Sequence, residues 1–267
     1  MGINIYLKEL RSYKKSVFFW SLGVVGLLVG AMSKYQGFSG TEGSIKEMID
    51  SLPGGVAALF GLGTVDLQTA GGWFSLVGLY LSVMLGVHAV LLGSEIIAKE
   101  ETDKTAEFLF AKPVSRARVL TSKLLAALTI IVTLNVVTAM ASLPIVSAFN
   151  KGPSISGDIL LLMPGIFFIQ LLFLIIGVSF AAIMRRPKRA GQLSAAVLLT
   201  TFIISAFIDL TDKFNFLKYL TPFKYFDSKI IFVDRAYDVS FIIITFVMVS
   251  ALLVVSHIFY KRRDFNI

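Results

Sequence analysis

The chain has 267 residues, of which 56% are hydrophobic and only 16% are charged. When glycine replaces tyrosine in the count, the apolar share is about 61%, whereas soluble domains reach roughly 45–50%, which argues against a water-soluble enzyme. The formal charge of +8 leaves nucleic acid and anionic lipid open as partners, and the absence of cysteine excludes disulfides and thiolate metal sites.

Six segments contain no Asp, Glu, Lys or Arg and are long enough to cross about 30 Å of hydrocarbon as helices. Lipid offers the backbone no hydrogen-bond partner, so spans this apolar should be helical. The sequence therefore predicts an all-α membrane protein, with one transmembrane domain over residues 1–267 and six transmembrane helices. The predicted spans cover residues 16–33, 71–94, 124–150, 159–184, 192–208 and 239–260.

The first 15 residues have an amphipathic pattern. Apolar side chains recur at helical spacing from Ile3 to Tyr13, while Lys8, Arg11 and Lys15 take the opposite arc. This pattern predicts an interfacial helix that acts as an elbow and levers the first span. The alternative is a basic flank that only fixes the orientation of the chain.

The first span, residues 16–33, is predicted to be a retained anchor, because a charged segment precedes it and no convincing cleavage site ends it. It carries Gly23, Gly26 and Gly30, whose spacing suits a close contact with another helix, for example across a dimer. Glycine is common in membrane helices, so the alternative is that these three have no packing role. Residues 34–70, which follow, are predicted to form an outer cap or a partly embedded hairpin, or else a loop packed on the bundle.

Residues 95–123, between the second and third spans, are highly charged yet contain three consecutive large apolar residues, Phe108–Phe110. Asp103 or Thr105 can cap a short helix that Pro113 ends, and Ser115 can cap the next helix. A solvated charged segment has no need of three large apolar side chains, so they predict docking to a cytosolic partner. The alternative is that they pack back on the membrane ends of the protein itself.

At these residues the chain resembles the permease subunits of the ABC-2 type, the type V ABC exporter family. Lys104 stands where that family usually has glycine, and Phe110 where a second leucine is common, which leaves the start of the helix open. The resemblance continues in the first outer loop, at residues 219–227 and at residues 260–265. The residues of the loop that fit the family pattern are Glu95, Glu101, Thr105, Glu107, Leu109, Pro113, Val114, Ser115, Arg116 and Lys123.

The resemblance implies that a cytoplasmic coupling helix in this loop inserts into a groove on a separate cytosolic ABC ATP-binding subunit. It also implies a second permease copy or a homologous permease, with ATP and Mg on the partner subunit and no cofactor bound by this chain. The apolar residues would then fill the groove and the charged residues would form its rim. The interface residues expected on this basis are Glu100, Glu101, Thr105, Glu107, Phe108, Leu109, Phe110, Pro113 and Arg116.

Other energy sources and chemistries find little support in the sequence. The glycine-rich phosphate-binding pattern that ends in Lys and Ser or Thr is absent, so this chain is not predicted to bind ATP by that route, nor to be an enzyme by itself. Apart from tyrosine, the predicted spans offer only His88 and His257 as titratable groups. Two alternatives stay open: an ion-coupled secondary transporter, and a non-transporting membrane anchor or sensor.

An even number of spans places both termini on one side of the membrane. If that side is the cytoplasm, it carries 17 of the 25 Lys and Arg residues, and the charge divides into +10 inside and −2 outside. The basic charge then reports topology, so nucleic acid is not a predicted partner and membrane lipid is. We therefore predict a multi-pass protein of a bacterial or archaeal plasma membrane with both termini cytoplasmic. Residues 209–238, rich in Phe and Tyr, are either an aromatic belt or, as the resemblance implies, a re-entrant hairpin at the outer mouth.

Overall fold

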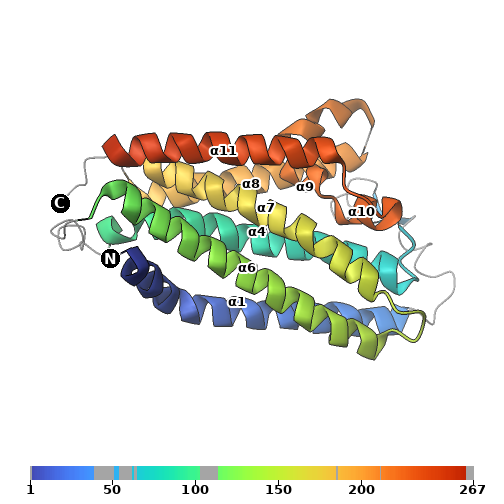
Figure 1. The fold of residues 1–267 in the computed structure, drawn as a ribbon. Helices are drawn as coiled ribbons and strands as arrows, with labels where there is room; N and C mark the ends of the chain where they lie inside the picture. The colour runs from blue at the N-terminus through green and yellow to red at the C-terminus, as the bar shows by residue number, and fades with distance from the viewer. Residues whose placement is uncertain are drawn as a thin grey trace.

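The computed structural model describes residues 2–38, 51–53, 62, 65–102, 114–184, 186–210 and 212–262, and every regular element in these ranges is helical. Six of the helices are long and apolar enough to cross a membrane, and they run along one bundle (Figure 1). This confirms the predicted all-α fold with six spans. The six are α1 (Gly2–Phe38), α4 (Ala70–Thr102), α6 (Arg116–Phe149), α7 (Ser156–Ile183), α8 (Pro187–Leu210) and α11 (Val239–Arg262).

Helix α1 begins and helix α11 ends at the same end of the bundle, which we call the terminal end (Figure 1). Helix α4 also ends there and α6 begins there, so the loop expected to dock a partner joins them at the terminal end. Residues 103–113 of that loop lie outside the described ranges, as does most of the predicted cap at residues 34–70. The opposite end holds three short elements, η1 (Asp212–Leu220), α9 (Pro222–Tyr225) and α10 (Ser228–Asp234).

Helices α4 and α7 form the centre of the bundle and are the most enclosed of the spans. Their cores are continuous with apolar residues of the other helices, such as Leu28 on α1, Leu134 on α6 and Leu198 on α8, all fully buried. Helices α1, α8 and α11 bury a smaller share of their surface. Because lipid surrounds a span, exposed apolar residues on these outer helices are expected.

The N-terminal interfacial helix expected at residues 1–15 is not a separate element, because α1 runs without a break from Gly2 to Phe38. Residues 2–38 contain no proline, so nothing in the sequence stops the helix from continuing into the span. The N-terminal part of α1 is nevertheless inclined to the rest of the helix (Figure 1). The predicted elbow is therefore a bend within one helix.

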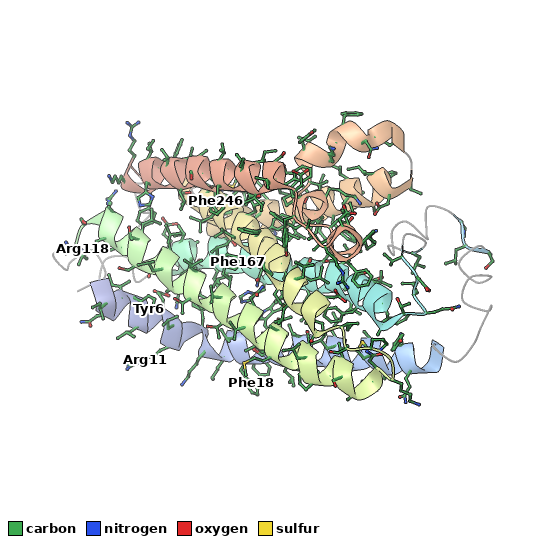
Figure 2. All side chains as sticks on the ribbon, turned by 45° about the vertical axis from the view of Figure 1, so that its right-hand side comes forward. Tyr6, Arg11, Phe18, Arg118, Phe167 and Phe246 are labelled. Atoms are coloured by element: carbon green, nitrogen blue, oxygen red, sulfur yellow. The ribbon has the colours of Figure 1, made fainter. Side chains whose placement is uncertain are left out.

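The first turns of α1 bury only part of the apolar arc that the sequence predicts. Ile3 and Leu7 belong to that arc, but they are 73% and 42% exposed. The buried positions are Ile5, Glu9 and Tyr13, which repeat every four residues along one side of the helix, and of these only Tyr13 belongs to the arc. The basic residues are exposed as predicted, and Arg11 points away from the bundle (Figure 2). An acid therefore lies on the face of α1 that packs on the protein.

The connection between α8 and α11 is half enclosed and half exposed. Residues 221–229 are buried, and the ring of Phe223 packs against Phe173 and Phe202, with centroids 5.4 and 5.6 Å apart. Pro222 at the first position of α9 and the side chain of Asp227 at the start of α10 begin these short helices. An aromatic belt on the surface does not describe this half. Element η1 exposes large side chains, namely Phe214, Phe216, Tyr219 and Leu220.

Candidate functional site

Two helices frame the loop that the sequence identifies as a docking element. Helix α4 extends past its uncharged core to Thr102, and α6 begins at Arg116, so both present charged turns at the terminal end. Ser115 caps α6 as predicted, because its side chain accepts a hydrogen bond from the backbone N–H of Arg118 at 3.3 Å. The described part of the site consists of these two flanks.

Most of the expected interface residues are located in the loop itself. Glu100, Glu101 and Arg116 are the members that the structure describes. For the rest, docking stays a prediction from the sequence. The members that lie outside the described residues are Thr105, Glu107, Phe108, Leu109, Phe110 and Pro113.

Glu100 faces the protein interior and not a partner. It is 4% exposed, and its Oε2 lies 2.5 Å from the Nζ of Lys123 on α6. Lys123 is fully buried and also donates to the backbone carbonyl of Ile96 on α4. The expected position of Glu100 on an exposed rim therefore does not fit this geometry. Together Glu100 and Lys123 hold the end of α4 against the start of α6 across the loop.

Glu9 on α1 completes this group of charges, and the sequence analysis did not single it out. Its carboxylate is fully buried, 3.5 Å from the Nζ of Lys99 and 3.9 Å from the Nζ of Lys123. Lys99 also donates to Ser12 on α1 and lies over the ring of Tyr13, 5.0 Å from its centroid. We call Glu9, Lys99, Glu100 and Lys123 the terminal charge cluster. It holds two positive and two negative side chains, so the buried cluster has a net charge of zero.

Two further contacts tie α6 to its neighbours near the terminal end. The Nη1 of Arg116 donates to the backbone carbonyl of Lys261 on α11 at 3.0 Å. Tyr6 on α1 points toward α6, where its hydroxyl lies 3.0 Å from the Oγ1 of Thr129 (Figure 2). Four helices, α1, α4, α6 and α11, are thus linked by polar contacts around the loop. A displacement of the loop would be carried to several spans at once.

The glycines of the first span make little contact within the chain. A Cβ on Gly23 would lie 2.7 Å from the terminal methyl of Met84, which is the end of a flexible side chain. A Cβ on Gly26 or Gly30 would meet nothing within 4 Å among the described residues. Both are exposed, so a contact with a second copy stays a prediction.

A second group of buried charges holds the opposite end together. Lys224 on α9 lies 2.5 Å from Asp209 on α8 and 2.8 Å from Asp227, and Lys229 on α10 lies 3.1 Å from Asp209. Burial alone would lower the pKa of Lys224, but the carboxylates of Asp227 and Asp209 outweigh it and raise that pKa. We call these four residues the opposite-end charge cluster. It borders a cavity of about 630 Å³ between α8, α10 and α11.

Polar side chains within the spans pack mostly against neighbouring helices. His88 on α4 is 3% exposed and lies edge-on to Trp20 of α1, with ring centroids 5.1 Å apart. Asn135 on α6 donates to the side chain of Gln170 on α7 at 3.3 Å. These contacts stabilise helix pairs in an apolar setting. They do not by themselves form a path for an ion.

The family comparison agrees with this architecture. A family model described as ABC-2 family transporter protein matches residues 3–265, which includes all six spans and both flanks of the loop. A comparison with curated proteins finds no match. Members of the matched family are membrane components of transporters and are not themselves ATPases. The chain is thus a multi-pass membrane protein that belongs to the ABC-2 family of transporter proteins.

Proposed function

We propose that this chain is the permease subunit of an ATP-driven exporter, which couples ATP hydrolysis by a separate cytosolic ATP-binding subunit to substrate export across the plasma membrane. In this proposal the terminal end is cytoplasmic, a second permease copy or a homologous permease completes the transporter, and ATP and Mg bind to the partner subunit. The loop between α4 and α6 is the element on which that subunit acts. The chain itself performs no hydrolysis.

The observation that carries the proposal is the link between the two flanks of the loop. Glu100 on α4 and Lys123 on α6 form a buried ion pair at 2.5 Å directly behind the loop. A buried pair resists separation, because either charge left alone inside the protein would be strongly destabilising. Force applied to the loop would therefore move the ends of α4 and α6 together. Helix α4 lies at the centre of the bundle, so that motion would reach its core.

The distribution of charged residues supports a cytoplasmic position of the terminal end. The terminal end carries most of the Lys and Arg residues that lie outside the spans, with a net charge of +10 against −2 at the opposite end. Positive charge is retained on the cytoplasmic side of bacterial membranes. The loop would then face the compartment in which an ATP-binding subunit has access to ATP.

The test is co-purification from native membranes. Phe108→Asp combined with Leu109→Asp should abolish the ATPase activity that purifies with an affinity-tagged chain, because charge would replace the apolar residues expected in the partner's groove. The matched control is Phe214→Asp combined with Phe216→Asp, which changes two exposed aromatic residues of η1 at the opposite end. The control should keep the ATPase. Undiminished co-purification of the loop variant would reject this docking site, and a wild-type chain that brings down no ATPase would reject the proposed function.

A further inference from the structure

Glu9 stands out among the buried charges of the terminal end. Its side chain is fully buried, yet neither carboxylate oxygen accepts a hydrogen bond from any described residue. Its two lysine neighbours remain at ion-pair distances of 3.5 and 3.9 Å. Lys123, by contrast, is in direct contact with Glu100 at 2.5 Å. Buried polar atoms in proteins nearly always have hydrogen-bond partners, so a buried carboxylate without one requires an explanation.

We propose that Glu9 is a positioning residue of the coupling loop. It keeps the N-terminal part of α1 docked on Lys99 and Lys123, the lysines on the two flanks of the loop, and the closest contact of Lys123 passes from Glu100 to Glu9 as those flanks move together against α1, without breaking the ion pair that links the flanks. This inference deepens the proposed function, because it rests on the loop being the place where the ATP-binding subunit acts. It assigns a role to an acid that lies about 90 residues away from the loop in sequence.

The distances permit such an exchange. Helix shifts in switching proteins are commonly about 1–2 Å, and a shift of that size would bring the Nζ of Lys123 from 3.9 Å into hydrogen-bond distance of Glu9. Lys99 stays within reach of Glu9 at 3.5 Å, so the Glu9 carboxylate has a cation beside it in both arrangements. The cluster keeps its two positive and two negative charges throughout. A movement of Lys123 by about 1 Å would leave it within ion-pair distance of Glu100, which it now contacts at 2.5 Å, so neither arrangement leaves a buried carboxylate without a cation beside it.

The exchange would also carry motion into α1. The start of α1 contacts α6 closely, since a Cβ on Gly2 would lie 3.2 Å from the Oγ of Ser122. If Glu9 accepts Lys123 when α6 shifts, the N-terminal part of α1 has an electrostatic reason to follow α6. The bend within α1 separates this part from the rest of the helix (Figure 1). The N-terminal part would therefore act as one body with the loop flanks.

Cysteine cross-linking measures this docking directly, because the chain contains no cysteine of its own. Gly2→Cys with Ser122→Cys places two thiols where a disulfide is sterically possible, since a Cβ on residue 2 would lie 3.2 Å from the Oγ of Ser122, close to the distance of about 3 Å between a Cβ and the partner's sulfur in a disulfide. The rate of disulfide formation in isolated membranes is read from the loss of labelling by a maleimide mass tag. In this background Glu9→Gln should lower the rate several-fold. The control Lys8→Gln, which changes an exposed neighbour on the same helix, should leave the rate unchanged.

Three more variants test the charge pairing of Glu9 and the exchange of Lys123. Glu9→Lys should nearly abolish the cross-link, and adding Lys99→Glu should restore it, because the exchanged pair returns the cluster to neutrality. Glu100→Gln should keep or raise the cross-linking rate, since Lys123 would then move to Glu9. If Glu100→Gln lowers the rate as much as Glu9→Gln does, the exchange of Lys123 is wrong.

The outcomes separate this inference from the proposed function. An unchanged rate in Glu9→Gln overturns the role of Glu9. If that variant fails to accumulate in membranes, the exchanged pair Glu9→Lys with Lys99→Glu decides: recovery of the cross-link supports the inference, and failure rejects it. In the purified complex, Glu9→Gln should change the ATPase rate at least twofold, while the amount of ATPase bound to the chain stays constant. A wild-type chain that brings down no ATPase would reject the proposed function, whereas the cross-link in membranes would still report on Glu9.

Discussion

Gly93 on α4 and Gly177 on α7 bring the backbones of the two central spans into direct contact. A Cβ on Gly93 would lie 2.2 Å from the carbonyl oxygen of Leu174, and a Cβ on Gly177 would lie 2.3 Å from the carbonyl oxygen of Val90. Real Cβ atoms do not approach backbone this closely, so each glycine requires the absence of a side chain. In lipid, where apolar surface alone does not drive helices together, such close approach contributes van der Waals contact over the whole interface.

Substituting Gly177 by Ala should therefore destabilise the protein strongly. Overpacking a well-packed core costs about 1–3 kcal/mol, and here the obstacle is backbone, which cannot rotate away as a side chain can. The measurement is the temperature at which the detergent-solubilised chain loses its monodisperse peak in size-exclusion chromatography. Gly26→Ala is the matched control, because a Cβ there meets nothing within 4 Å among the described residues. Equal thermal stability of both variants would contradict the close packing of α4 on α7.

Lys224→Met should destabilise the opposite end of the bundle. Removing one partner of a buried ion pair costs about 3–5 kcal/mol, and here Asp227 would lose its compensating charge while Asp209 would keep only Lys229. The raised pKa of Lys224 fixes the pH dependence of the effect. A raised folded-state pKa means that the stabilisation is complete below the ordinary lysine pKa of 10.5 and is lost as the pH rises through the folded-state value.

The stability difference between wild type and Lys224→Met should therefore be constant from about pH 7 to pH 10 and shrink above about pH 10.5. Thermal unfolding of both proteins across this pH range gives the difference directly. Lys218→Met serves as the control, because Lys218 lines the same cavity and has no ion pair within the described residues. A difference that shrinks already between pH 7 and pH 9 would contradict the assigned direction of the pKa shift.

The membrane spans were predictable because each is a continuous uncharged segment of sufficient length, which is a local property of the sequence. The role of Glu9 was not, because its partners Lys99 and Lys123 are about 90 and 114 residues away in sequence and meet it only after α1, α4 and α6 have packed. The available signal was an acid within a basic segment. The burial of Ile5 and Glu9 on α1 was not predictable for the same reason, since contact with neighbouring helices decides which positions are buried.

The close contact at Gly93 and Gly177 was not predictable from the sequence either. The first span has the closely spaced set of Gly23, Gly26 and Gly30, whereas Gly93 and Gly177 lie in α4 and α7, where other glycines are spread along each helix. Nothing in either local sequence indicates that the two will face each other's backbone. Such pairs are found only once the register of one helix against the other is known.

His88→Ala should leave function largely intact if the chain is a permease driven by a separate ATPase. His88 packs edge-on against Trp20, which is a structural contact, and an ion-coupled carrier would instead depend on this group to bind or relay an ion. The measurement is complementation of whatever phenotype deletion of the gene produces. His88→Gln, which keeps more of the volume, controls for a cavity beside Trp20. Loss of complementation by both variants at normal membrane levels would favour the ion-coupled alternative.

Gly26→Cys should give a disulfide-linked dimer in oxidised membranes if the first spans of two copies meet at their glycines. Gly26 is exposed within the single chain, so its free face is available to a second copy. The absence of native cysteine makes the band on a non-reducing gel unambiguous. Phe18→Cys is the control: Phe18 is exposed and lies about two turns before Gly26 on the same helix (Figure 2). Equal cross-linking at both positions would indicate random collision and not a glycine-mediated contact.

Labelling of single cysteines in intact cells should establish which side of the membrane each end of the bundle faces. Gly152→Cys lies in the exposed turn between α6 and α7 at the opposite end, and Lys261→Cys lies near the end of α11 at the terminal end. With the terminal end cytoplasmic, a membrane-impermeant maleimide should label position 152 in intact cells and position 261 only after the cells are opened. The expectation rests on the net charge of +10 on that side, which the positive-inside rule retains in the cytoplasm. The reverse pattern would invert the topology and place the α4–α6 loop where no cytosolic ATPase could reach it. Labelling of both positions in intact cells would contradict the arrangement of six spans itself.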